Sequence, residues 1–172
     1  MLPSIRTCRT QAERTTAQLN NVMTLQRLAV LSRRQENALC CDCTADASEW
    51  IVLPYGMFVC DTCASVHREL GPLVSIVKSF RQPELLWFPD ELIAVETMGN
   101  TRARTICLHK TGAPPKMDVH APLESKRHRA RAVYELQQYM KHGRNASPEP
   151  PASNADMALT FDNNAFFKSF GL

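Results

Sequence analysis

No run of about eighteen apolar residues occurs in this sequence, so we expect no segment of it to span a membrane. A strong charge of one sign is also missing: the formal net charge is +3, and we expect no nucleic-acid partner. Acidic residues are absent from the first twelve positions, which contain Arg6 and Arg9 and faintly resemble a transit peptide. Glu13 ends that pattern and no amphipathic face follows. Residues 1–20 are therefore expected to form a flexible extension.

The chain is long enough, at 172 residues, for one domain with a hydrophobic core and for tails. It contains seven cysteines, and four of them form two Cys-x-x-Cys pairs separated by sixteen residues. The first pair is Cys40 with Cys43 and the second is Cys60 with Cys63. This spacing is typical of zinc ligands. Cysteines used in this way suggest that the protein resides in a reducing compartment.

The two pairs together supply four thiolates, the number that completes a tetrahedral zinc shell. Each pair can fold the chain back so that both of its sulfurs face one ion. Cys41 has the wrong spacing and is expected to be a bystander. Because four sulfurs leave no open position for water, the sequence predicts one structural zinc rather than a catalytic one. The alternative, four unconnected core cysteines, is disfavoured by the closeness of the pairs.

The segment after the second pair predicts a short helix over residues 64–70, with Gly71 as its C-cap and Pro72 preventing its continuation. This helix places a His-Arg pair, His67 and Arg68, at a fixed distance from the metal.

A wider set of residues resembles the catalytic domain of Arf GTPase-activating proteins, over about residues 21–143. The resemblance rests on the cysteine spacing together with Trp50, Gly56, His67-Arg68, Leu70-Gly71 and Gly99-Asn100. It implies an α+β fold: a small zinc-finger domain with a three-stranded antiparallel sheet flanked by about five helices.

Hydrophobic patterns predict where these elements lie. Strands are predicted at residues 49–52, 57–59 and 74–80, and helices at 21–34, 89–99, 101–108 and 124–142. Pro54-Tyr55-Gly56 should turn the first two strands into a hairpin that brings the cysteine pairs together. Asn20 or Asn21 should cap the first helix, with Val22 in its buried stripe. Residues 111–123 read as a surface connection.

The resemblance also implies a function, stimulation of GTP hydrolysis by an Arf-class small GTPase in its GTP-bound form. Arg68 matches the family's arginine finger, which stabilises charge that spreads over the transferred phosphoryl group. Trp50 either packs over the zinc site or, as the resemblance implies, also shapes the surface that meets the GTPase. Leu70 and Lys78 would form or support that surface, and His67 would make a structural hydrogen bond. A role in vesicle traffic is implied, with a cytoplasmic location and peripheral contact with the Golgi or other membranes.

Two other functions stay open. Ile76 stands where the family usually has an Arg, and Trp87 arrives about two residues late. Such departures would suit a zinc-stabilised scaffold that binds Arf, or another partner, without accelerating hydrolysis. A DNA-binding zinc module of the GATA type has similar spacing but needs a basic helix after its second pair, which residues 64–72 do not supply.

The end of the chain carries two further patterns. Lys126, Arg127, Arg129 and Arg131 form a basic run that predicts either a solvated helix face or attraction to anionic lipid. Residues 144–172 combine a Pro/Ser-rich linker with an aromatic tail, and we expect them to be disordered.

Overall fold

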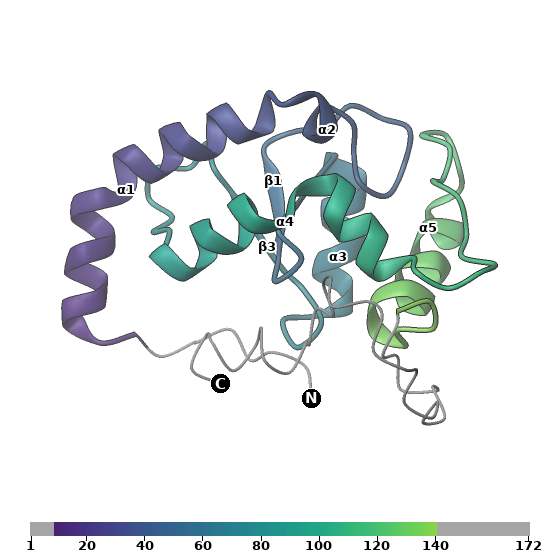
Figure 1. Cartoon of the computed structure of the whole chain (residues 1–172). Coiled ribbons are helices and arrows are strands. Elements are labelled where there is room, and N and C mark those ends of the chain that lie inside the picture. The colour runs from purple at the N-terminus through teal and green to yellow at the C-terminus, as the bar shows by residue number, and fades with distance from the viewer. Residues whose placement is uncertain (1–8, 141–172) are drawn as a thin grey trace, which may run out of the picture.

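The computed structural model describes residues 9–140 of the chain (Figure 1). The expectations for residues 1–8 and 141–172, including the Pro/Ser-rich linker and the aromatic tail, lie outside the described residues. Between them, five α-helices and three strands follow the order α1-α2-β1-β2-α3-β3-α4-α5 and end in a π-helix, η1. This arrangement has the expected α+β character. Within residues 9–140, none of the helices has both the length and the apolar composition needed to cross a membrane.

The sheet has the strand order β2-β1-β3, and both neighbouring pairs are antiparallel. Its strands are β1 (Trp50–Leu53), β2 (Met57–Val59) and β3 (Ile76–Ser79). Trp50 of β1 lies opposite Val59 on one side and Ser79 on the other. The predicted hairpin is therefore confirmed, with β1 as the central strand.

Side chains of β1 alternate between two hydrophobic cores, as the twofold period of a strand requires. Ile51 and Leu53 contribute to a core that also contains Leu28 and Trp87. Val52 contributes to the other core, which contains the zinc-type cysteines and side chains of α3, α5 and η1. Because both faces of the sheet are covered, its strands are mostly apolar rather than alternating between apolar and polar residues.

Helix α1 (Gln11–Ser32) begins ten residues earlier than the sequence patterns predicted. Thr10 is its N-cap: the Thr10 hydroxyl accepts from the Glu13 N–H at 3.2 Å, and the Glu13 carboxylate accepts from the Thr10 N–H at 2.7 Å. This capping box satisfies two otherwise unpaired N–H groups. Residues 11–20 are thus helical, which corrects the flexible extension over 1–20. Val22, expected to be buried, is 65 % exposed.

Asn21, one of the two residues predicted as the helix cap, lies in the middle of α1 and is buried. Its side-chain oxygen accepts from the backbone N–H of Trp87 at 3.0 Å, and its amide nitrogen donates to the Pro83 carbonyl at 3.0 Å. The side chain therefore fixes the loop that follows β3 against α1 rather than starting a helix.

Helix α4 (Pro89–Cys107) is interrupted at Gly99, as predicted, where φ is 62° and ψ is 176°. The backbone N–H of Asn100 donates to the Asn37 side chain of the short helix α2 (Gln35–Ala38) at 2.9 Å. The Asn100 side chain binds the backbone of Phe58 in β2 and the carbonyl of Leu39. The Gly-Asn pair thus turns the helix and joins it to the sheet edge.

The last helical segment is shorter than predicted. Helix α5 (Leu123–Ala130) continues as the π-helix η1 (Arg131–Glu135), and the chain then turns at Gln137, where φ is 50°. This turn brings Tyr139 back, and its carbonyl accepts from the Lys110 N–H at 3.0 Å. Met140 is buried as a result. The helix predicted to reach residue 142 therefore ends at Glu135.

Candidate functional site

The two cysteine pairs meet at one point, as predicted. Cys60 is the N-cap of helix α3 (Asp61–Leu70) and Cys63 lies in its first turn, while Cys40 and Cys43 belong to the loop after α2. All four are buried, and their Sγ atoms lie within 4.8 Å of one another. The Cys43 and Cys60 sulfurs are 3.6 Å apart.

These positions fit a tetrahedral zinc ion. Zn–S bonds of about 2.3 Å in a tetrahedron place the sulfurs about 3.8 Å apart. The cysteines therefore hold one structural zinc. Cys41 and Cys107 are also buried but lie outside the cluster, so Cys41 is the bystander that its spacing indicated. Cys8 lies outside the described residues.

Asp42, inside the first pair, is the centre of a buried network that sequence reasoning missed. Its carboxylate lies 2.9 Å from His67 Nε2, accepts from Arg129 Nη1 at 2.9 Å, and accepts from the Tyr134 hydroxyl at 2.6 Å. The partners come from α3, α5 and η1. Asp42 therefore joins the first cysteine pair to three elements far along the chain.

The charge on Asp42 is stabilised by these partners. Burial alone would raise the pKa of this carboxyl, but the hydrogen bonds and charges of His67, Arg129 and Tyr134 hold the pKa well below its ordinary value. Burial raises the pKa of Tyr134, so its hydroxyl stays protonated and can donate. The network is thus built around an ionised carboxylate.

His67 also faces the Ser75 hydroxyl, with Nδ1 at 3.2 Å, which completes an Asp–His–Ser series like that of serine hydrolases. The geometry does not support such chemistry. The His67 side chain is 0 % exposed, so no substrate can reach it, and the Ser75 hydroxyl donates to the His67 carbonyl at 2.9 Å. His67 makes structural hydrogen bonds that join α3 to Asp42 of the first cysteine pair and to Ser75, the residue before β3.

Arg68, the next residue, points away from this network toward solvent. Successive residues of an α-helix are about 100° apart around its axis, so burying His67 leaves Arg68 on the outer face of α3. Arg68 is exposed, and its guanidinium carbon lies 4.2 Å from the centre of the Trp50 ring. Such a cation–π contact favours one position of a long, flexible side chain. Trp50 and Arg68, both singled out by the resemblance, are thus in contact.

The remaining predicted interface residues lie deeper. Leu70 is half-buried and packs against the core that contains the zinc ligands. The Lys78 ammonium donates to the Glu91 carboxylate at 2.7 Å and to the Leu86 carbonyl at 2.6 Å. Its side chain is only 14 % exposed and is engaged by these internal partners, so its role at a GTPase surface stays a prediction. Trp87, which the sequence places two residues late, is buried and donates to the Ser79 carbonyl.

Two of the four cations in the basic run, which spans α5 and the first residue of η1, are buried, so the run is not the solvated helix face that is one of its two predictions. Arg129 is buried against Asp42, and Lys126 is buried with its ammonium donating to the Val119 carbonyl at 2.7 Å. Arg127 pairs with Glu69 of α3 at 2.7 Å. Only Arg131 of the four is well exposed. The buried pair corrects the expectation of a fully solvated face, whereas the attraction of Arg127 and Arg131 to anionic lipid stays a prediction.

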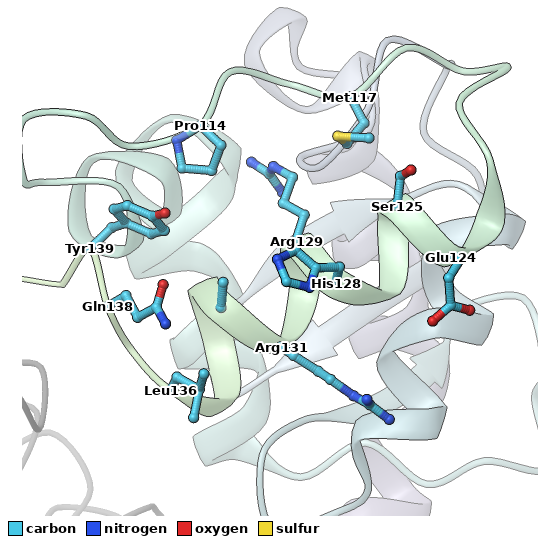
Figure 2. A pocket seen from close by; sticks show the side chains of 11 residues that line it. Pro114, Met117, Glu124, Ser125, His128, Arg129, Arg131, Leu136, Gln138 and Tyr139 are labelled. Atoms are coloured by element: carbon cyan, nitrogen blue, oxygen red, sulfur yellow. The ribbon is translucent and has the colours of Figure 1, made fainter.

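An open groove of about 690 Å³ lies beside η1, between α5 and the connection before it. Figure 2 shows His128 near its centre, Tyr139 and Gln138 on one side, and Arg131 pointing away from them. Tyr139 lines this groove, whereas Tyr134 is buried in the Asp42 network. The sequence carried no signal for the groove, because it forms from the turn after η1.

Comparisons with known proteins all point to one family. Residues 25–143 match the family described as "Putative GTPase activating protein for Arf". Mouse (Mus musculus) stromal membrane-associated protein 1 is 35 % identical over 101 residues, which are 59 % of this chain and 21 % of that protein. Human (Homo sapiens) ARF GTPase-activating protein GIT1 is 38 % identical over 88 residues, which are 51 % of this chain and 11 % of that protein.

The fold is shared as well. The solved ArfGap domain of HIV-1 Rev binding protein matches with a TM-score of 0.60 and 19 % identity. The match covers 73 % of this chain and 93 % of that domain. At this identity the likeness shows the fold alone. The chain spans only about a fifth or less of the length of the two curated relatives described above.

Proposed function

Because this chain belongs to the family of GTPase-activating proteins for Arf, we propose that it stimulates GTP hydrolysis by an Arf-class small GTPase, with Arg68 as its arginine finger. The observation that carries the proposal is the exposure of Arg68 on a helix whose opposite face is fixed to a zinc site. The names of the curated relatives, which include an ARF GTPase-activating protein, support the choice of partner.

The geometry suits the chemistry. In phosphoryl transfer, negative charge spreads over the transferred group, and catalysis consists mainly of positioning and electrostatic stabilisation. Arg stays charged and offers a rigid fork of donors that can contact several oxygens at once. The zinc ligands Cys60 and Cys63 anchor the start of α3, and His67 anchors its inner face. Arg68 can therefore approach a partner without unfolding any element.

We further propose that the partner is Arf in its GTP-bound form, because only that form carries the γ-phosphoryl group on which a finger acts. The protein would meet it in the cytoplasm, at a Golgi or other membrane that carries the GTPase, and act there in vesicle traffic. No described residue is assigned to membrane contact, since most of the basic run on α5 is engaged in internal and surface pairing.

The experiment is a GTP hydrolysis assay against a panel of Arf GTPases, with wild-type protein and Arg68→Lys. Lys keeps the positive charge but loses the planar fork. Arginine fingers contribute on the order of 10³–10⁵ in rate, so Arg68→Lys should remove most of the stimulation. Arg14→Lys, at an exposed Arg of α1, is the matched control and should keep the wild-type rate.

Two results would contradict the proposal. Stimulation by folded Arg68→Lys within about threefold of wild type would mean that Arg68 is not the finger, since a finger contributes orders of magnitude. Absence of stimulation by the wild type, with Arf binding retained, would favour the non-catalytic scaffold instead. Binding of Arf loaded with GTP or GDP, measured in the same preparation, separates these outcomes.

A further inference from the structure

Asp61 carries a contact that the proposed function leaves unexplained. It is the first residue of α3, and its carboxylate accepts a hydrogen bond from the Trp50 indole Nε1–H at 2.6 Å. The same oxygen accepts from the Ser48 hydroxyl at 3.2 Å. Both contacts lie on the exposed side of the molecule, where water could have served the indole N–H equally well.

The position of Asp61 relative to Arg68 explains what this contact can do. The two residues are seven apart on α3, which is about two turns, so they share one face of the helix about 10 Å apart along its axis. Trp50 reaches this face from β1. Its N–H meets Asp61, and the face of its ring lies 4.2 Å from the Arg68 guanidinium carbon. The indole therefore bridges the two ends of the exposed face.

We propose that Asp61 is a positioning residue for Arg68. By holding the indole N–H, it fixes the orientation of the ring on which the guanidinium stacks. The inference rests on the proposed function of Arg68, because it assigns Asp61 a role in that same site. Asp61 touches neither the phosphoryl group nor the nucleotide in this assignment; it acts through Trp50.

The physical basis is restriction of a flexible side chain before the partner arrives. Arg has large rotamer freedom. The side-chain entropy that Arg68 loses when it is immobilised in the complex raises the free energy of the transition state. An indole that is attached to the chain at one end and hydrogen-bonded to Asp61 at the other offers the guanidinium one favoured place. A ring free to rotate about its own side-chain bonds offers several, and a smaller fraction of molecules then has Arg68 in position.

Asp61 could instead serve only α3, because an acidic residue in the first turn interacts favourably with the helix dipole. A third reading is that its charge touches the GTPase. The variant Asp61→Asn separates these readings from ours. Asn keeps the side-chain oxygen that accepts from the indole but removes the charge. Asp61→Ala removes both.

The kinetic test measures two quantities for each variant. These are the maximal stimulated rate of GTP hydrolysis and the concentration of this protein that gives half of that rate. An exposed cation–π contact corresponds to about a two- to fivefold effect in rate. We expect Asp61→Ala to lower the maximal rate by about that factor while the half-saturating concentration stays within about twofold. Asp61→Asn should behave like wild type. Asp46→Ala, which removes an exposed acidic residue elsewhere, is the control for net charge.

A second measurement does not depend on activity. The chain has two tryptophans, and the indole N–H of each can be followed by NMR. In Asp61→Ala the Trp50 indole N–H should exchange faster with solvent and change its chemical shift. The Trp87 indole N–H is bonded to the Ser79 carbonyl in the core and serves as the internal reference.

A double-mutant cycle connects the two measurements. Trp50→Phe keeps an aromatic face for Arg68 but has no N–H for Asp61. In that background Asp61→Ala should cause no further loss of rate, because the two residues act through one contact.

Three results would overturn the proposal: unchanged Trp50 exchange in Asp61→Ala, equal losses in Asp61→Asn and Asp61→Ala, or additive losses in the cycle. Absence of wild-type stimulation with normal Trp50 protection would overturn the function of Arg68 and, with it, this role, while leaving the contact itself established.

Discussion

The inner and outer faces of α3 differ in burial and in the contacts that their side chains make. On the inner face, His67 is completely buried and belongs to a network in which Asp42 meets three partners from distant elements. On the outer face, Arg68 is exposed and rests on one aromatic ring. These adjacent residues thus have different functions, because the inner face fixes the position of the helix and the outer face presents a charge.

The difference teaches how a small domain can offer a rigid functional group without a deep active site. The zinc ligands and the Asp42 network stabilise the position of the α3 backbone, and only the Arg68 side chain needs local support. We therefore expect changes on the inner face to act on stability and changes on the outer face to act on rate.

The largest effect should follow from removing a zinc ligand. Binding of structural zinc in small peptides is worth roughly 10–16 kcal/mol, as much as the whole stability of a typical domain. Cys43→Ser should therefore yield unfolded protein without metal, as measured by circular dichroism and metal analysis. Cys41→Ala is the control and should retain one zinc per chain. Folded wild type without zinc would contradict this.

The second-largest effect should follow from removing the buried carboxylate of Asp42. Asp42→Ala leaves Arg129 buried without its carboxylate, and breaking a buried ion pair in this way costs about 3–5 kcal/mol. Denaturant unfolding should show this loss in the free energy of unfolding. Asp46→Ala, at an exposed acid four residues away, should change it by about 0.5 kcal/mol or less. Equal effects of the two variants would mean that the network contributes nothing.

A smaller effect on stability is expected on the outer face. Arg68→Lys should change the free energy of unfolding by about 0.5 kcal/mol or less, since surface substitutions usually do. The same variant should lose most GTPase stimulation. Thermal unfolding and zinc content, measured on the protein used for the hydrolysis assay, test the contrast directly. Unfolding of Arg68→Lys at clearly lower temperature would show that the two faces are not independent.

The smallest effect concerns the end of the chain. A protein that ends at Arg144 should keep its zinc and its thermal midpoint, because a Pro/Ser-rich linker separates the tail from the domain. Differential scanning calorimetry of the shortened and full chains provides the measurement. A midpoint several degrees lower would mean that phenylalanines of the tail pack on the domain and that this boundary is misplaced.

Much of this site could be predicted from the local spacing of residues. The cysteine pairs, the turn at Gly56 and the short helix through Arg68 depend on residues close in sequence, and the strands follow from short apolar runs. The Asp42 network joins residues 25, 87 and 92 positions apart, and no local pattern indicates those partners. The position of Asp42 between two zinc ligands therefore does not reveal its role in the network.

Two errors have identifiable causes. The charged run on α5 resembled a solvated face because composition cannot show that the connection before it folds over the helix and supplies carbonyls for Lys126 and Arg129. The start of α1 was missed although Thr10 and Glu13 have capping-box spacing. The prediction placed the N-cap at Asn20 or Asn21 instead, whereas Asn21 is buried in the middle of α1.

Asn100 has a consequence for how the sheet meets other chains. β2 is an edge strand, and such strands offer unpaired backbone groups on which another strand can add. Phe58 directs its N–H and carbonyl to that edge, where the Asn100 side chain binds both and the Cys41 N–H adds a bond to the carbonyl. One amide side chain thus occupies the place of a fourth strand. It protects this edge of the domain from intermolecular strand pairing and the aggregation that such pairing begins.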